Sequence, residues 1–407
     1  MKQLHESTSE LAKKIIPYID YAVLLAYALM LFCEFSRYIE SRDVDFWNVF
    51  YNSYVQKYLL FVVVIKLFLY AFSNMKYSIL SLAGIIASYV FNRYLDPKPW
   101  FFLTVLLVVS VYKIKFERII YTFLIAVGIP FVIKSIGAII GVFPNGVEVV
   151  HDRRPRYDLG FTHHNTAFNY FFFVFLAVVY ELRKKNVKFL AIGILTVILI
   201  GMFYVTDSIS GTVMLIGCLL LLLIDSAVNT DHFSKWKKIY DKALGVLGIC
   251  SVPLALLVSV AGTLGWNYYC LLYGMPEKWS TAFSRFFCIS YNAGINGLKL
   301  PMQPDYIPVQ ENGFNWIFGG VAERWEDNLY GALFIDHGVI VFALYIALLV
   351  GWIVISRKRK SNTMLIIAIT IAFMNVMEAA SLLYGWNPFL LLPFALSEIS
   401  KDYVETT

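Results

Sequence analysis

The stretch AIGILTVILIGMFYVTDSISGTVMLIGCLLLLLI, residues 191–224, holds two long apolar runs on either side of a short polar turn. Each run approaches the about 20 residues that a helix needs to cross the core of a bilayer. Strands are excluded, because backbone groups in lipid must pair within their own segment and the runs lack the alternation of a membrane β-barrel. The stretch therefore predicts two transmembrane helices joined by a tight hairpin.

The composition of the whole chain agrees with this pattern. The chain has 407 residues, of which 59% are hydrophobic and only 15% are charged, and its mean hydropathy is +0.66. A soluble domain is about half apolar and about a quarter charged, so that class is excluded. The net charge of +6 does not indicate nucleic-acid binding, because the basic residues form short clusters between apolar runs. We expect an all-α polytopic integral membrane protein, with residues 1–407 as a single membrane domain.

The length of a membrane-crossing helix predicts about twelve transmembrane spans in this chain. Their expected ranges are 17–36, 56–73, 77–92, 100–114, 119–143, 164–182, 188–206, 211–228, 243–264, 329–355, 362–381 and 383–399. Basic clusters then fall on alternate turns, at Lys76, 113–118, 183–188, 235–242 and 357–360, on the side of the N-terminus. The positive-inside rule places that side in the cytoplasm, and both termini with it.

One basic cluster falls on the opposite side. Arg153, Arg154 and Arg156 lie between the fifth and sixth spans, in the stretch RRPRYDLGFTHHNTAF at 153–168. A basic cluster there opposes the topology signal, so another requirement must keep it in place. One interpretation is a loop neutralised by its own carboxylates. The other is an anion bound at the outer surface, since arginine pairs phosphate oxygens bidentately. The carboxylates available for the first interpretation are Glu148, Asp152 and Asp158.

One long loop, residues 265–328 between the ninth and tenth spans, lies on the same outer side as this cluster. It is rich in aromatic residues, which suit both interfacial anchoring and stacking on sugar faces. These residues are Trp266, Tyr268, Tyr269, Tyr273, Trp279, Tyr291, Tyr306, Trp316 and Trp325. The loop also holds charged candidates for a site, namely Arg285, Glu323, Arg324 and Asp327. We expect the loop and the arginine cluster to form one site.

The motif THHNTAFN, residues 162–169, opens the sixth span. Thr162 or Asn165 is a suitable N-cap, and a helix N-terminus favours anions. His163 or His164 is a candidate general base near neutral pH, and Asn165 is a candidate for substrate binding. The alternative is a pair of interfacial histidines that only bind water. We expect no metal site, because neighbouring residues diverge by about 100° on a helix.

The hairpin TDSISG, residues 206–211, is an outer turn between the seventh and eighth spans. Asp207 and Ser208 are candidate hydrogen-bond partners for a substrate. The alternative is an ordinary polar turn, for which these residue types are typical.

Two lysines, Lys66 and Lys134, lie inside apolar runs. An ionisable residue at membrane depth is a candidate functional residue. The alternative is a side chain that extends toward the membrane surface.

These motifs follow one order along the chain, with LGFTHHNT first, TDSISG next and ERWEDNLYGALFIDHG (323–338) last. In this order, over residues 120–390, the chain resembles bacterial Wzy-type polysaccharide polymerases (O-antigen, capsule and exopolysaccharide), which share a core with O-antigen ligases. Such proteins often carry GFxHPNxxG where this chain has GFTHHNTAF, and DNxYxxxLxxxG where it has DNLYGALFIDHG. Two departures matter. His164 replaces the proline, so the family histidine corresponds to His163, and Ile209 stands where the family hairpin often has arginine.

The resemblance implies a GT-C-like membrane glycosyltransferase architecture with one large extracytoplasmic loop, in the bacterial cytoplasmic membrane. It implies transfer of a glycan from undecaprenyl diphosphate to the terminal hydroxyl of another lipid-linked repeat unit, without a metal or cofactor. Donor and acceptor are then both lipid-linked glycans. A flippase and chain-length regulator proteins would be partners, and nucleic acid would not.

The implied chemistry assigns roles to the candidate residues. Without a metal, fixed cations must stabilise the negative charge of the diphosphate leaving group. The acceptor hydroxyl also needs a group that takes or orients its proton. Candidates for substrate binding are Arg153, Arg154, Arg156, Arg285, Asn165, Arg324, Asp207 and Ser208. Candidates for proton transfer are His163, His164, Glu323 and Asp327.

Three other functions fit parts of the sequence. An O-antigen-type ligase uses the same chemistry with a different acceptor, and the sequence barely separates it from a polymerase. A flippase for lipid-linked oligosaccharides would also be polytopic, but it should distribute charge over two pseudo-symmetric halves, and no internal repeat is visible. A membrane scaffold without catalysis leaves the charge at the helix ends unexplained.

Overall fold

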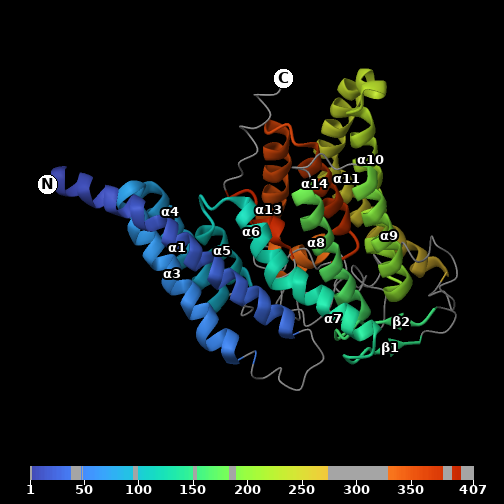
Figure 1. Cartoon of the computed structure of the whole chain (residues 1–407), viewed down its shortest axis with the longest axis horizontal. Helices are drawn as coiled ribbons and strands as arrows, with labels where there is room; N and C mark the ends of the chain where they lie inside the picture. The colour runs from blue at the N-terminus through green and yellow to red at the C-terminus, as the bar shows by residue number, and fades with distance from the viewer. Residues whose placement is uncertain are drawn as a thin grey trace. The chain divides into compact units, whose positions relative to one another are not determined.

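The computed structural model describes residues 2–37, 47, 49–94, 100–149, 154–182, 189–273, 329–378 and 387–395, which are mostly helical (Figure 1). Within these residues, eight helical segments are long and apolar enough to cross a membrane. This confirms the prediction of a helical membrane protein at that level. The segments are Glu10–Arg37, Tyr51–Phe72, Phe116–Ile139, His164–Leu182, Phe189–Thr206, Ile209–Val228, Asp231–Val260 and His337–Lys358.

Four expected spans take a different form. Those at 77–92 and 362–381 correspond to the shorter apolar helices Met75–Phe91 and Asn362–Met374. The span expected at 100–114 ends at Ser110 as α5 (Trp100–Ser110). Its 11 residues rise only about 16 Å, which is too short to cross a bilayer alone.

The last expected span, 383–399, is not a spanning helix in its described part. Residues 387–395 contain only a short 3₁₀-helical turn, η7 (Pro388–Leu391). Proline has no backbone N–H to donate, and Pro388 and Pro393 both fall in this segment. The apolar composition therefore predicted a helix where the prolines favour a turn.

The chain divides into two compact units, which alternate along the sequence. Unit 1 comprises residues 1–178, 205–207 and 383–407, and unit 2 comprises residues 179–204 and 208–382. Helix α1 packs against α3 and α6 in unit 1, and α3 packs against α4 and α5. The elements of unit 1 are α1 (Lys2–Arg37), η1 (Tyr51–Val55), α3 (Gln56–Ser73), α4 (Met75–Tyr94), α5, α6 (Phe116–Phe123), η2 (Leu124–Gly128), α7 (Ile129–Ile139), a two-stranded sheet and η7, together with most of α8 (His164–Leu182).

A buried lysine stabilises the break between α5 and α6. The ammonium of Lys66, which is 1% exposed, lies 2.7 Å from Oδ1 of Asp20. It also donates to the carbonyls of Ser110, at 2.5 Å, and Tyr112, at 3.0 Å. The last carbonyls of a helix have no partner inside it, so Lys66 supplies donors where α5 ends. Lys66 is thus held inside unit 1.

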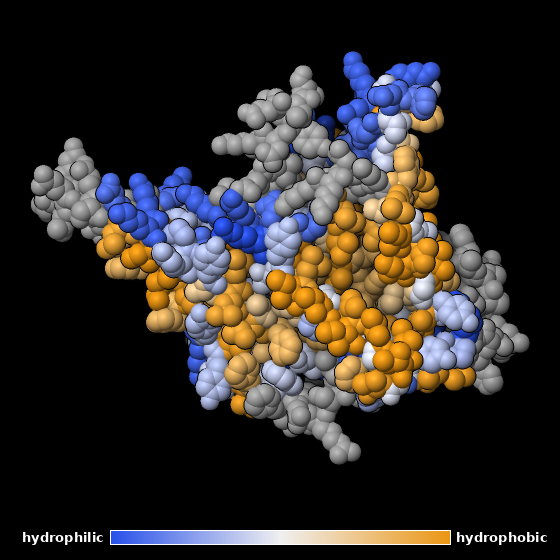
Figure 2. Space-filling model, viewed as in Figure 1, coloured by the Kyte–Doolittle hydropathy of each residue, from blue (hydrophilic) through white to orange (hydrophobic). Residues whose placement is uncertain are grey.

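Unit 2 is built around α14 (Asn362–Met374), whose residues 364–372 are all buried. Helices α10, α11 and α13 pack against it, which explains why this short helix is apolar on every side. Many apolar side chains on the outer faces of the longer helices are exposed, and they form the orange areas of Figure 2. Lipid tails are the environment that suits such faces. The other helices of unit 2 are α9 (Phe189–Thr206), α10 (Ile209–Val228), η4 (Asp231–Phe233), α11 (Ser234–Tyr273) and α13 (Leu329–Lys358).

Candidate functional site

A β-hairpin connects α7 to α8 in unit 1. Its strands, β1 (Val147–Glu148) and β2 (Arg156–Tyr157), are antiparallel, with Glu148 opposite Arg156. Opposite residues of an antiparallel pair have adjacent side chains. The hairpin therefore brings a carboxylate to one of the arginines that the sequence singled out.

Hydrogen bonds fix the segment that follows the hairpin. The Asp158 carboxylate accepts from the backbone N–H groups of Gly146, at 2.9 Å, and Gly160, at 2.8 Å. The side-chain oxygen of Asn145 accepts from the N–H of Leu159 at 3.1 Å. The Asp158 carboxylate thus holds the backbone of this segment in place.

The turn at Gly160 leaves no room for a larger residue. Gly160 has φ +79°, a left-handed conformation that favours glycine. A Cβ at this position would lie 2.5 Å from Cε of Lys134 and 2.8 Å from the carbonyl oxygen of Pro144. The Lys134 side chain is 8% exposed, and its ammonium lies 4.8 Å from the centre of the Phe143 ring. Lys134 therefore packs beneath the turn that leads to the two histidines.

The next residue, Phe161, anchors the turn in an aromatic cluster. Its ring lies 5.5 Å from that of Phe35, 5.8 Å from Phe131 and 5.6 Å from Tyr170, measured between centres. These rings come from α1, α7 and α8, and Phe161 is fully buried. Burial of an aromatic ring among three others fixes where α8 begins.

The helix α8 begins at His164, and His163 stands just before it. The Nδ1 atom of His163 accepts a hydrogen bond of 3.2 Å from the backbone N–H of Asn165. This is the contact that an N-cap side chain makes, so His163 has the role that was expected of Thr162 or Asn165. With Nδ1 as the acceptor, we assign the proton of a neutral His163 to Nε2, which makes Nε2 a donor.

The second histidine lies between two charged residues. Arg156 Nη1 lies 3.2 Å from Nε2 of His164, and Glu148 Oε2 lies 2.9 Å from its Nδ1. Arginine can only donate, so Nε2 accepts, and the proton of a neutral His164 is on Nδ1, facing Glu148. Arg156 and Glu148 therefore lie beside the two ring nitrogens, and His164 is 4% exposed while His163 is exposed. Of the two histidines, His163 is the one that a substrate can reach.

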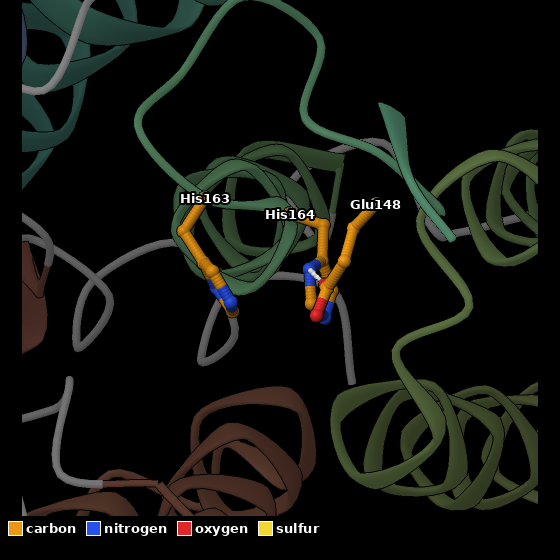
Figure 3. Close-up of side chains that lie close together, drawn as sticks. All are labelled: Glu148, His163 and His164. Carbon is orange, nitrogen blue, oxygen red and sulfur yellow. Dashed lines mark ion pairs between the residues drawn. The ribbon is translucent and has the colours of Figure 1, made fainter. Parts of the chain in front are cut away.

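The two imidazoles do not diverge as expected for neighbours on a helix. Their ring centres are 4.0 Å apart, because His163 precedes the helix, and Figure 3 shows both rings near Glu148. Donor atoms of these three residues lie within 4.8 Å of one another, a spacing that suits a metal ion. However, each imidazole lone pair already accepts a hydrogen bond, from Asn165 or Arg156. A metal would require both rings to change tautomer, so the absence of a metal from the site stays a prediction.

The arginines are held by a residue from the hairpin TDSISG. Oδ1 of Asp207 lies 2.7 Å from Nη2 of Arg154, and Oδ2 lies 3.6 Å from Nε of Arg156. Asp207 has φ +50°, an uncommon conformation for a residue other than glycine. Expected as a substrate ligand, Asp207 is here the residue that fixes the positions of two candidate anion ligands. The guanidinium of Arg154 remains the more accessible, at 43% exposed against 11% for Arg156.

The remaining expected site residues either have other contacts or lie outside the described part of the chain. Ser208 belongs to unit 2, where it is buried and its carbonyl accepts a hydrogen bond of 2.6 Å from Thr212. Asn165 contributes its backbone N–H, and Asn169 is buried in α8. Helix α11 extends to Tyr273 and so includes the start of the segment 265–328. Site residues that lie outside the described part of the chain are Arg153, Arg285, Glu323, Arg324 and Asp327.

The sequence did not assign Glu148 a place in the site beyond neutralising the loop. Its contact with His164 depends on the hairpin register, and the turn-forming PNG at 144–146 lies before the first strand, so it does not specify that register. Lys134 was noted as a charge within an apolar run, but nothing in the sequence indicated that it lies beneath Gly160.

Comparisons of the chain with protein-family models, with curated proteins and with solved structures find no significant match. The resemblance to polysaccharide polymerases therefore rests on the residues of the motifs and on their order along the chain.

Proposed function

We propose that this protein polymerises lipid-linked glycan repeat units, by transfer of a glycan from a lipid diphosphate to the terminal hydroxyl of another repeat unit. The observation that carries the proposal is the pair of arginines bridged by Asp207 beside the exposed His163, at the start of α8. The lipid diphosphate is undecaprenyl diphosphate in the proposal. The site would face the outer side of a bacterial cytoplasmic membrane, with both termini in the cytoplasm.

The arginines supply the charge that the leaving group needs. As the glycosidic bond breaks, negative charge accumulates on the diphosphate, and positioned donors stabilise it. Arg154 is the more exposed of the two arginines, and a planar guanidinium suits bidentate contact with phosphate oxygens. Asp207 and Glu148 also keep the two guanidinium groups in fixed positions, which lowers the cost of ordering them when a substrate binds.

The imidazole of His163 suits a different role from that of a base. With the proton on Nε2, this histidine donates a hydrogen bond, and the adjacent diphosphate oxygens are the natural acceptors. The acceptor hydroxyl then gives its proton to a carboxylate, and Glu323 or Asp327 are the candidates from the sequence. The hydroxyl oxygen attacks the anomeric carbon, the bond to the diphosphate oxygen breaks, and the configuration inverts.

A lipid-linked substrate requires a site next to helices that face lipid. The lipid of the substrate has to remain in the bilayer while its diphosphate reaches the arginines at the membrane edge. The hairpin and the start of α8 lie at one end of the segments Phe116–Ile139 and His164–Leu182, both long and apolar enough to cross the bilayer. A ligase would share this arrangement and differ only in its acceptor.

The test is turnover by the purified full-length chain in lipid nanodiscs. The substrate is the lipid-linked repeat unit extracted from source cells that lack this protein, incubated with a chelator of divalent metals. Extension to products of two or more repeat units, resolved on gels, supports the proposal. Movement of the lipid across the bilayer without any new glycosidic bond supports a flippase and contradicts it.

A matched pair of variants links the activity to the site. Arg154→Gln is expected to reduce extension at least about a hundredfold, in the range of losing one charge-stabilising donor. Lys57→Gln removes one exposed charge of the same sign elsewhere in unit 1 and should leave extension unchanged. Equal extension by both variants would contradict the assignment of this site.

A further inference from the structure

At one end of unit 2, the side-chain amide of Asn362 connects three helices. Nδ2 of Asn362 donates to Oδ1 of Asp225, at 2.7 Å, and to Oδ1 of Asp241, at 2.8 Å. These residues belong to the start of α14, the last turns of α10 and the first turns of α11. The guanidinium of Arg357, near the end of α13, lies against Gly245 of α11. Four helix ends therefore meet here, and we call this region the basic end.

The charge of the basic end is strongly positive. It carries eight basic residues against three acidic ones in residues 225–242 and 357–362. Two of the three carboxylates are engaged with Asn362. Within the described part of the chain, Lys235, Lys238 and Lys242 make no ion pair with a carboxylate, and all three are exposed. The basic residues are Lys235, Lys237, Lys238, Lys242, Arg357, Lys358, Arg359 and Lys360.

An apolar stripe begins within this positive surface. Trp236 is 51% exposed and Ile239 is 60% exposed, on the first turns of α11. The stripe continues along the helix to Val246 and Ile249, which are also exposed. In the same turns, the hydroxyl of Tyr240 donates to the carbonyl of Leu221 in α10 at 2.9 Å. Figure 2 shows polar residues at this end of α10 and α11, next to the apolar side of the helices.

We propose that the basic end binds the phosphate headgroups of anionic phospholipids in the leaflet that surrounds it. Lysine stems lie along apolar surface while their ammonium groups reach the headgroups, and tryptophan prefers the same interfacial depth. The attraction of a basic surface to an anionic leaflet grows with each lysine or arginine near it. The apolar stripe favours a lipid over a soluble phosphate, because the side chains beside the lysines need an apolar environment.

This proposal does not depend on the glycan transfer proposed above, because its test measures lipid binding. The full-length chain is purified in neutral detergent micelles that contain phosphatidylcholine, and phosphatidylglycerol is then titrated in. Native mass spectrometry counts the bound lipids of each kind. We expect the wild-type chain to bind phosphatidylglycerol in preference to phosphatidylcholine. The variant Lys235→Gln/Lys238→Gln/Lys242→Gln should weaken phosphatidylglycerol binding about tenfold, after allowance for screening by salt.

A second triple variant controls for net charge. Lys13→Gln/Lys57→Gln/Lys76→Gln removes three exposed lysines of unit 1 and should change binding less than about twofold, because these residues are not in the basic end. The variant Trp236→Ser tests the apolar stripe and should weaken binding without any loss of charge. All variants are compared in phosphatidylcholine alone, where equal melting temperatures show that they are folded.

Three results would overturn the proposal. They are equal weakening by both triple variants, no preference for phosphatidylglycerol in the wild-type chain, and full displacement of the bound lipid by inorganic phosphate at similar concentration. The first would indicate a response to net charge alone. The last would indicate a site for a soluble anion.

Discussion

The carboxylate of Asp207 lies 2.7 Å from the guanidinium of Arg154, although 53 positions separate the two residues in the sequence. The same carboxylate lies 3.6 Å from Arg156, so one acidic residue fixes two cations that the proposed reaction uses. In the structure Asp207 therefore orients the arginines, while its predicted contact with a substrate stays a prediction.

The variant Asp207→Asn tests this role. An amide keeps the shape of the carboxylate but loses its charge, so we expect the arginines to lose their fixed positions. Glycan extension should fall about tenfold or more, in line with the cost of misplacing groups at a reaction centre. Asp231→Asn removes an exposed carboxylate in η4 of unit 2 and should have no effect on extension. Unchanged turnover by the Asp207 variant would show that the arginines do not need this partner.

The turn at Gly160 gives a prediction about stability, with a matched control in the same loop. Gly160→Ala and Gly141→Ala both place a Cβ on a left-handed residue, with φ +79° and +78°, respectively. That conformation costs about 1–2 kcal/mol for a residue with a side chain. A Cβ at Gly141 meets no atom within 4 Å, whereas one at Gly160 meets Lys134 and Pro144. Gly160→Ala should therefore reduce the free energy of unfolding by a further about 1–3 kcal/mol, the usual cost of overpacking.

The measurement is the free energy of unfolding of each variant in mixed micelles, by titration with a denaturing detergent. Equal values for the two variants would mean that the Lys134 side chain moves away at no cost. The backbone conformation alone would then account for the glycine at position 160.

The long helices of this fold could be predicted from the sequence, and the short ones could not. A run of about 20 apolar residues is itself the requirement for crossing a bilayer, so segments such as 189–206 follow directly from the composition. The end of α5 at Ser110 is different, because the apolar residues continue to Val111. What permits the break is the ammonium of Lys66, more than forty residues away in the sequence, which bonds to the freed carbonyls. A tertiary contact of this kind leaves no local pattern.

In the candidate site, too, contacts between neighbours in the sequence could be predicted, and contacts between distant segments could not. The proximity of His163, His164 and Arg156 is local in the sequence, so the motif was enough to predict that they lie together. The sequence left open which histidine is accessible, because the answer depends on Glu148 across the hairpin and on the N–H of Asn165. The contact of Asp207 with the arginines joins segments that are distant in the sequence, so no local pattern predicts it. The expectation that the two imidazole rings diverge was wrong because it placed both histidines on the helix.

The buried pair of Lys66 and Asp20 predicts a strong stability effect. Lys66→Met removes the donors for two carbonyls and leaves the carboxylate of Asp20, which is 14% exposed, without its partner. Breaking a buried ion pair from one side costs about 3–5 kcal/mol. The double variant Lys66→Met/Asp20→Asn should recover part of this loss, since no unpaired charge remains.

The control for this prediction is Lys57→Met in the same helix, α3, where the side chain is exposed and a small effect is expected. The comparison uses the unfolding free energies of the wild-type chain, Lys66→Met, Asp20→Asn, the double variant and Lys57→Met. A double variant that is as unstable as the sum of the single ones would mean that the two charges do not depend on each other.

The two histidines allow a final test that separates contact with the substrate from support of the site. His163 is exposed with Nε2 facing outward from its hydrogen bond to Asn165, whereas His164 is buried between Arg156 and Glu148. We expect His163→Ala to reduce glycan extension with little change in unfolding free energy. We expect His164→Ala to reduce both, because it leaves Arg156 and Glu148 without a shared neighbour. His163→Gln, which keeps an N–H donor, should retain more activity than His163→Ala if the residue donates to the diphosphate. Full loss in both His163 variants would instead favour a proton-accepting role, because glutamine cannot act as a base at neutral pH.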